Sequence, residues 1–194
     1  GKVTADWMMN GHINEDLFIY DIKRFQKFHS EVKFITERIT ETLGDLYGMH
    51  WPYKQHKTSR NQKLFPYHEE LKKAGACFGV SSGYERPMWF ALNNEKPEFK
   101  YSYNDQNWYP AVKFETKNAR EHVGLFDLTA FSKYDIKGEN AHSELQKICT
   151  ANVKDEIGKT TYTQMLNKDG GIETDLTVVC LDKNYFRIIT SAAN

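Results

Sequence analysis

The stretch TYTQMLNKDGGIETDLTV, residues 161–178, has the pattern of a β-hairpin. Its side chains alternate in character up to the sequence NKDGG, whose residues favour the positive φ values of a tight turn, and they alternate again after it. Asp175 is unexpected there, because aspartate is among the residues least suited to the interior of a strand. Its carboxylate either faces water or meets a ligand, and periodicity alone favours water.

Residues two apart on a strand share one face of the sheet. Glu173, Asp175 and Thr177 are therefore predicted to share a face, while Leu176 and Val178 on the other face have the character of a core. The face of Asp175 is polar at its start and becomes apolar further along. Such a face can line a pocket with a carboxylate at its floor, which is the alternative to a simple solvated surface.

The composition excludes several classes of function. The 194 residues carry 26 basic and 26 acidic side chains, so no net charge attracts nucleic acid or an anionic membrane. No run approaches the roughly 20 apolar residues of a membrane span. The three cysteines are odd in number and far apart, which fits reduced thiols, and no spacing typical of a metal site is present. We therefore predict no nucleic-acid partner, no membrane span and no metal.

The two ends suggest a piece of a longer protein. The chain starts with Gly1, shows no signal peptide, and stops at YFRIITSAAN, where a strand is finishing. Because a strand without a partner is a poor terminus, we expect an internal fragment.

The remaining pattern predicts an α+β fold. Apolar residues recur every three or four positions in residues 29–48, which predicts a helix capped by Ser30 and ended by Gly48. Shorter helices are expected over 1–11, 66–75, 113–124 and 140–151, the last with Ile148 among its inward residues. Strands are expected within 76–92, with a turn between them, and over 130–138, and an extended segment over 17–25.

A second charged feature lies in SSGYERP, residues 81–87. Glu85 stands next to Arg86 in a turn rich in aromatic residues. We interpret the two as a structural ion pair rather than a catalytic one.

Three stretches in order resemble a known family: FPYHEELKKAGACFGVSSGYERPMWF (65–90), VGLFDLTAFSKYDIKGENA (123–141) and YTQMLNKDGGIETDLTV (162–178). Together they are similar to the start of the folate-binding aminomethyltransferase fold of the glycine-cleavage T-protein. Their form most resembles the version fused behind a flavin domain in dimethylglycine and sarcosine dehydrogenases. Tyr84 departs from the tryptophan usual in that family but keeps an aromatic ring.

The same resemblance divides the chain into three parts. Residues 1–24, with GKVTADWMMNG, are similar to the tail of the FAD-dependent oxidoreductase domain. Residues 25–63 are similar to a central connecting domain, and 64–194 to the N-terminal part of the aminomethyltransferase-like folate-binding domain.

The resemblance implies a two-site enzyme, inactive as this fragment alone. FAD would oxidise the N-methyl group of a small methylated amine such as dimethylglycine or sarcosine, and tetrahydrofolate would take the one-carbon unit; the electron acceptor is left open. The enzyme would work in a bacterial cytoplasm or in the mitochondrial matrix. The implied site residues are catalytic Asp175, the folate-binding Thr177, Phe131 and Leu166, and Gly1 and Lys2 near FAD.

Two alternatives remain beside this interpretation. One is a stand-alone T-protein-like aminomethyltransferase, which residues 1–63 argue against because such proteins begin close to Phe65. The other is a non-catalytic folate-binding relative. The GYERP and DIKRF segments favour the dehydrogenase over both.

Overall fold

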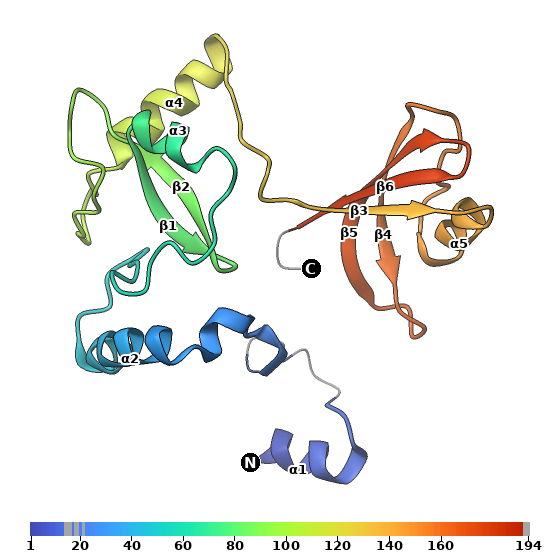
Figure 1. The fold of residues 1–194 in the computed structure, drawn as a ribbon, viewed down its shortest axis with the longest axis horizontal. Helices are drawn as coiled ribbons and strands as arrows, with labels where there is room; N and C mark the ends of the chain where they lie inside the picture. Colours follow the sequence, from blue (N-terminus) through green and yellow to red (C-terminus); the bar gives the residue numbers. More distant parts are fainter. Residues whose placement is uncertain (14–16, 18–19, 21, 192–194) are drawn as a thin grey trace. The chain divides into compact units, whose positions relative to one another are not determined.

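The computed structural model describes residues 1–13, 17, 20 and 22–191. These residues form two compact units, the first from 1–64 and 75–109 and the second from 65–74 and 110–194. Figure 1 labels the helices and strands along the chain. The helices are α1 (Lys2–Asn10), α2 (Val32–Tyr47), α3 (His68–Lys73), α4 (Tyr109–Glu121) and α5 (Ala141–Ile148), with short 3-10 helices η2 (Ile22–Arg24) and η3 (Lys27–Ser30). The strands are β1 (Ala76–Ser81), β2 (Tyr84–Phe90), β3 (Ser132–Lys137), β4 (Thr160–Leu166), β5 (Ile172–Asp182) and β6 (Tyr185–Thr190).

The first unit begins with α1, which ends as predicted at Gly11, whose φ of 72° closes the helix. Of the extended segment predicted over 17–25, residues 18, 19 and 21 lie outside the described residues. Residues Ile22–Arg24 form the 3-10 helix η2, so the prediction of an extended chain is wrong there. The pair β1–β2 is an antiparallel hairpin. Its turn places Ser82 at φ 50° and Gly83 at φ 80°, the left-handed geometry of a tight hairpin.

Helix α2 covers most of the predicted helix, but its caps differ. Glu31 precedes the first turn, and Ser30 instead donates its hydroxyl to the carbonyl of Lys27. The prediction of a Ser30 cap is therefore wrong. Gly48 follows the helix with an extended φ of −84°, so it ends the helix without a left-handed turn.

Charged side chains, more than apolar ones, attach α2 to the loop that follows it. Phe34 is the one buried residue of this helix. Arg38 donates to the carbonyl of Thr58 at 2.5 Å, and Glu41 accepts hydrogen bonds from the amides of Lys57 and Thr58 at 2.7 and 2.9 Å. The apolar residues that define the helical period in the sequence lie elsewhere on its circumference and are exposed.

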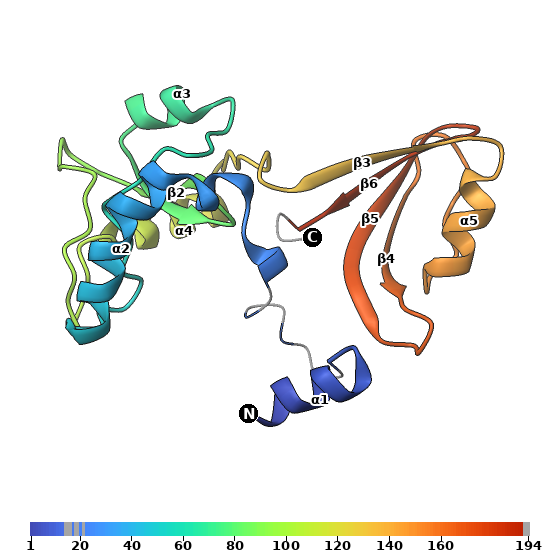
Figure 2. The same cartoon turned by 60° about the horizontal axis from the view of Figure 1, so that its bottom comes forward.

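The second unit contains a four-stranded antiparallel sheet in the order β3-β6-β5-β4 (Figure 2). The predicted hairpin is confirmed as β4 and β5, and Gly170 in its turn has a φ of 81°. Strand β6 lies between β3 and β5 and pairs with both. The expectation that this last strand lacks a partner is therefore wrong.

One face of the sheet holds the core of the second unit. Helix α5 contributes Ala141 and Leu145, and the sheet contributes Leu176, Val178 and Phe186 among other buried residues. Ile148 was predicted to point inward but is 43% exposed, so that prediction is wrong. Its neighbour Cys149 packs against the core instead.

Helices α3 and α4 depart from the prediction in detail. Helix α3 begins two residues after the predicted position, and within it Lys73 pairs with Glu70 at 3.0 Å. Helix α4 begins four residues before the predicted position, because Pro110 fits its first turn. Within the described part of the chain, every helix is too short or too polar to cross a membrane.

Candidate functional site

The hairpin of β4 and β5 brings four polar side chains to the face of the sheet opposite the core. Its register places Gln164 directly opposite Asp175, and Tyr162 directly opposite Thr177. Opposite residues in an antiparallel pair point to the same face. Asp175 is exposed and Thr177 half-buried, whereas their neighbour Leu176 is buried on the core side. The predicted division of the strand into two faces is confirmed.

A hydrogen bond links the two strands diagonally at this site. The phenol of Tyr162 donates to Oδ2 of Asp175 at 2.9 Å. The hydrogen bond and the negative charge of Asp175 raise the pKa of Tyr162, so the phenol stays protonated and keeps its donor. Among the described residues, no donor reaches Oδ1 of Asp175. A carboxylate can accept several hydrogen bonds, so this oxygen can receive one from a ligand.

The two predicted apolar walls lie at different distances from Asp175. Leu166 is half-buried near the turn end of the same hairpin. Phe131 precedes β3, whose first residue, Ser132, pairs with Thr190 of β6. Thr190 in turn pairs with the residue that follows Asp175. Phe131 therefore lies two strands away from Asp175, roughly 10 Å at the usual strand spacing.

Tyr162 and Gln164 were not singled out in the sequence. The signal was present, because alternation in YTQML puts both on one face and the hairpin turn fixes which strand residues they oppose. Which residues of β5 they oppose depends on the pairing register of β4 and β5, and the length of the turn alone did not establish that register.

A second polar network on the same face of the sheet is already satisfied. Arg187 donates to both carboxylate oxygens of Asp135, at 2.8 and 3.1 Å, and the phenol of Tyr185 donates to the same carboxylate at 2.6 Å. Hydrogen bonds from Arg187 and Tyr185 lower the pKa of Asp135 to about 2. This network joins β3 to β6.

The first unit contains the residues predicted near FAD. Gly1 precedes α1, and the ammonium of Lys2 pairs with Asp6 one turn on, at 2.8 Å. Both residues therefore lie at the beginning of α1, where their role toward FAD stays a prediction.

Glu85 forms an ion pair, although not with its neighbour Arg86. Its side chain is 2% exposed, and its carboxylate accepts hydrogen bonds from Nε of Arg60 at 2.7 Å and from Nη2 of the same residue. The amide of Asn61 donates to it as well, at 2.8 Å. The interpretation of Glu85 as structural is consistent with this geometry, but the assignment of Arg86 as its partner is wrong. Adjacent residues of a strand point to opposite faces, which separates Arg86 from Glu85.

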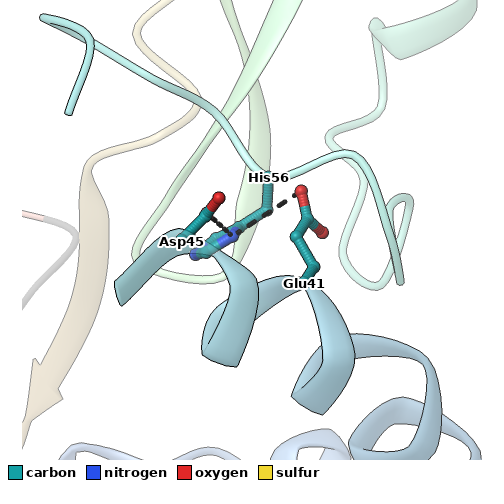
Figure 3. Close-up of side chains that lie close together, drawn as sticks. All are labelled: Glu41, Asp45 and His56. Carbon is teal, nitrogen blue, oxygen red and sulfur yellow. Dashed lines mark ion pairs between the residues drawn. The ribbon is translucent and has the colours of Figure 1, made fainter. Parts of the chain in front are cut away.

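Glu41, Asp45 and His56 form the charged cluster shown in Figure 3. The Nδ1 atom of His56 lies 4.0 Å from Glu41 and 3.8 Å from Asp45. The same carboxylates are engaged by protein donors, because Lys54 pairs with Asp45 at 2.5 Å and Glu41 accepts three hydrogen bonds from residues 57 and 58. With an ammonium already present, the cluster serves to hold the loop on α2 better than it would hold a metal ion.

Two family models match adjacent stretches of the chain. The family described as "GCVT N-terminal domain" matches residues 67–194, and the "FAD dependent oxidoreductase central domain" matches residues 10–64. A crystal structure of the glycine cleavage system aminomethyltransferase T from Bartonella henselae is similar with a TM-score of 0.55 and 27% identity, over 68% of this chain and 32% of that chain. Because the match to the GCVT N-terminal domain covers more than half of this chain, the chain belongs to that family.

The curated relatives extend far beyond the chain. The 4-methylaminobutanoate oxidase (formaldehyde-forming) of Paenarthrobacter nicotinovorans is 38% identical over 98% of this chain and 23% of its own length. Human mitochondrial sarcosine dehydrogenase is 30% identical over 92% of this chain and 22% of its own length. The mitochondrial pyruvate dehydrogenase phosphatase regulatory subunit of Mus musculus is 29% identical over 98% of this chain and 22% of its own length. The chain thus spans less than a quarter of these relatives, which include oxidoreductases of the sarcosine dehydrogenase type.

Proposed function

We propose that the chain is part of a flavin-dependent oxidoreductase that demethylates an N-methylated amino acid of the dimethylglycine or sarcosine type and passes the one-carbon unit to tetrahydrofolate. The observation that carries the folate step is the hydrogen-bonded pair of Tyr162 and Asp175 on the open face of the hairpin. The names of the oxidase and the sarcosine dehydrogenase support the oxidation. A bacterial cytoplasm or the mitochondrial matrix is the proposed compartment.

Asp175 is suited to act on an amine of the ligand. When bound, flavin supplies the oxidation of the N-methyl group, and tetrahydrofolate supplies the nitrogen that accepts the one-carbon unit. Tyr162 fixes one carboxylate oxygen of Asp175, and the other can accept a hydrogen bond and then a proton from a ring N–H. Thr177 lies on the same face and offers a hydroxyl that can hold the ligand in register.

The side chains of this face fit a folate ligand better than the beginning of α1 fits a flavin. The open face combines an ionised acceptor, a phenol and a hydroxyl with the partly apolar Leu166 and, two strands away, Phe131. Lys2, by contrast, has its ammonium engaged by Asp6. We therefore propose that residues outside this chain hold most of the flavin.

The proposal is tested by the Asp175→Asn variant of the full-length enzyme. Asparagine keeps the size and one acceptor oxygen but cannot take a proton, so formation of methylene-tetrahydrofolate should fall by about 100-fold or more. Flavin reduction by the amine should remain near its original rate, because the oxidation uses none of these residues. Formaldehyde should appear in proportion to the amine oxidised. All three are measured side by side at saturating folate.

The matched control is Glu173→Gln, which neutralises a carboxylate on the same face two residues away. It should leave all three rates unchanged. If the Asp175→Asn variant forms methylene-tetrahydrofolate as fast as the original enzyme, Asp175 is only a solvated strand residue. The role proposed for it in the folate step is then wrong. Absence of both oxidation and transfer in the unaltered full-length protein would favour a non-catalytic role, like that implied by the name of the regulatory-subunit relative.

A further inference from the structure

Helix α2 has three distinct faces, and one of them lacks a partner among the described residues of the first unit. Successive residues of an α-helix are rotated by about 100°. Phe34, Arg38 and Glu41 therefore fall on one side, and they are among the residues that contact the rest of the first unit. Lys33 and Thr40 fall on a second, polar side.

The third side is an uninterrupted apolar stripe. Its members are all aliphatic and all exposed: Val32 (79%), Ile35 (44%), Ile39 (50%), Leu43 (54%) and Leu46 (64%). The stripe is centred about 140° around the helix from the buried side, so the contacts of Phe34 and Arg38 cannot cover it. An amphipathic helix of a globular protein ordinarily buries such a stripe. Here the unit buries the charged side instead.

Helix α1 of the same unit shows the same excess of exposed apolar groups. Trp7 is 52% exposed, and Met8 and Met9 are 81% and 83% exposed. Two helices of one unit thus each expose apolar side chains, and exposed apolar surface of this kind marks interaction sites.

The length of the relatives and the family matched by α2 together point to the kind of partner. The matched relatives are more than four times as long as the aligned chain, and α2 lies within the match to a central domain of FAD-dependent oxidoreductases. We propose that the apolar stripe of α2 is the docking surface for the flavin-binding part of the same polypeptide, which precedes residue 1. This inference rests on the proposed function for the identity of the occupant.

The first experiment measures whether the stripe is covered in the full-length protein. Ile39→Cys and Thr40→Cys are neighbours in sequence but lie about 100° apart on the helix, one in the stripe and one on the polar side. The Ile39→Cys thiol should react with a maleimide at least about tenfold more slowly than the Thr40→Cys thiol, because a covered thiol reacts only when the interface opens. Equal rates would overturn the proposal.

The second experiment identifies what covers it. A photoreactive benzoylphenylalanine replaces Val32 at the edge of the stripe, with Lys33 as the control position, and the cross-linked peptide is mapped by mass spectrometry. A cross-link to the part of the same polypeptide before residue 1 is the expected result. A cross-link to the part after residue 194, or to a second copy, would overturn the proposal.

Flavin absorbance of the same preparation separates this inference from the proposed function. Bound flavin together with a reactive Ile39→Cys thiol would refute the interface and leave the function standing. A covered stripe in a full-length protein that binds no flavin would refute the identity of the occupant and the proposed oxidation together.

Discussion

The phenol of Tyr162 donates a hydrogen bond to Oδ2 of Asp175 at 2.9 Å, across two strands joined by a five-residue turn over residues 167–171. The bond orients the carboxylate on an open face of the sheet and leaves Oδ1 able to receive a ligand. Tyr162 is thereby a positioning residue for Asp175, and its contribution can be separated from that of the carboxylate itself.

Tyr162→Phe removes this hydrogen bond and keeps the ring. We expect methylene-tetrahydrofolate formation by the full-length enzyme to fall by about tenfold, in keeping with the loss of one hydrogen bond to a charged group, while amine oxidation is unchanged. The control is Tyr185→Phe, which removes the bond to Asp135 on the same face and should leave the folate step intact. Equal losses in both variants would show a structural effect only.

The pairing of Arg60 with Glu85 predicts a large effect on stability. Arg60→Met leaves the carboxylate of Glu85, which is 2% exposed, without its guanidinium partner. The free energy of unfolding should fall by about 3–5 kcal/mol. Arg86→Met, at the residue that follows Glu85 in the chain, should change the free energy of unfolding by only about 0.5 kcal/mol.

Urea unfolding followed by tryptophan fluorescence measures this difference. All four tryptophans lie within residues 1–108, so the signal reports the first unit. Similar effects of the two substitutions would contradict the assignment of Arg60 as the partner.

Glu41 gives the first unit a dependence on pH. Burial alone would raise the pKa of Glu41, but hydrogen bonds from the Thr58 hydroxyl and from the amides of Lys57 and Thr58 outweigh it and hold the pKa at about 2. Because this value lies below the ordinary 4.5, the stabilisation is complete above pH 4.5 and is lost as the pH falls toward 2. The free energy of unfolding lost when Glu41 takes up its proton is on the order of 3 kcal/mol.

Glu41→Gln should therefore be less stable than the original chain at pH 7, by about 1–3 kcal/mol. The difference should narrow as the pH falls below 4.5, where the original carboxylate begins to take up its proton. Unfolding free energies measured at several pH values check this, with the exposed Glu95→Gln as the control. A difference that stays constant from neutral pH down to pH 2 would refute the pKa assigned to Glu41.

The chain of 194 residues purified alone is expected to be colourless. Its sequence contains no glycine-rich loop of the type that cradles the phosphates of a dinucleotide. The full-length protein should show the visible absorbance of a flavin. A stoichiometric flavin spectrum from the 194 residues would mean that this part of the chain holds the flavin itself.

Local patterns in the sequence were sufficient to predict the hairpin and the C-terminal end of α1. Alternation and the NKDGG turn gave β4 and β5, and Gly11 gave the end of α1, because both depend on residues close together in the chain. The α+β class and the aminomethyltransferase-like fold were also correctly predicted.

Partners distant in sequence were not predictable in this way. Glu85 pairs with Arg60, 25 residues away, rather than with its neighbour, and strand β6 is paired on both sides although it looked unpaired. The assignments of Asp175, Thr177, Phe131 and Leu166 to folate, of Gly1 and Lys2 to FAD, and of the domain boundaries at residues 24 and 63 remain predictions.

The central place of β6 also governs the order in which the sheet can assemble. Strands β4, β5 and β6 follow one another and can pair as successive hairpins, whereas β3 is made long before its neighbour β6. During synthesis, the edge of β3 that pairs with β6 therefore stays unpaired until residues 185–190 have left the ribosome. Closing this long loop is the slow step expected of a non-local strand pair. A newly made chain interrupted before Tyr185 would expose two strand edges at once, which makes the interval between β3 and β6 the period of greatest risk of aggregation.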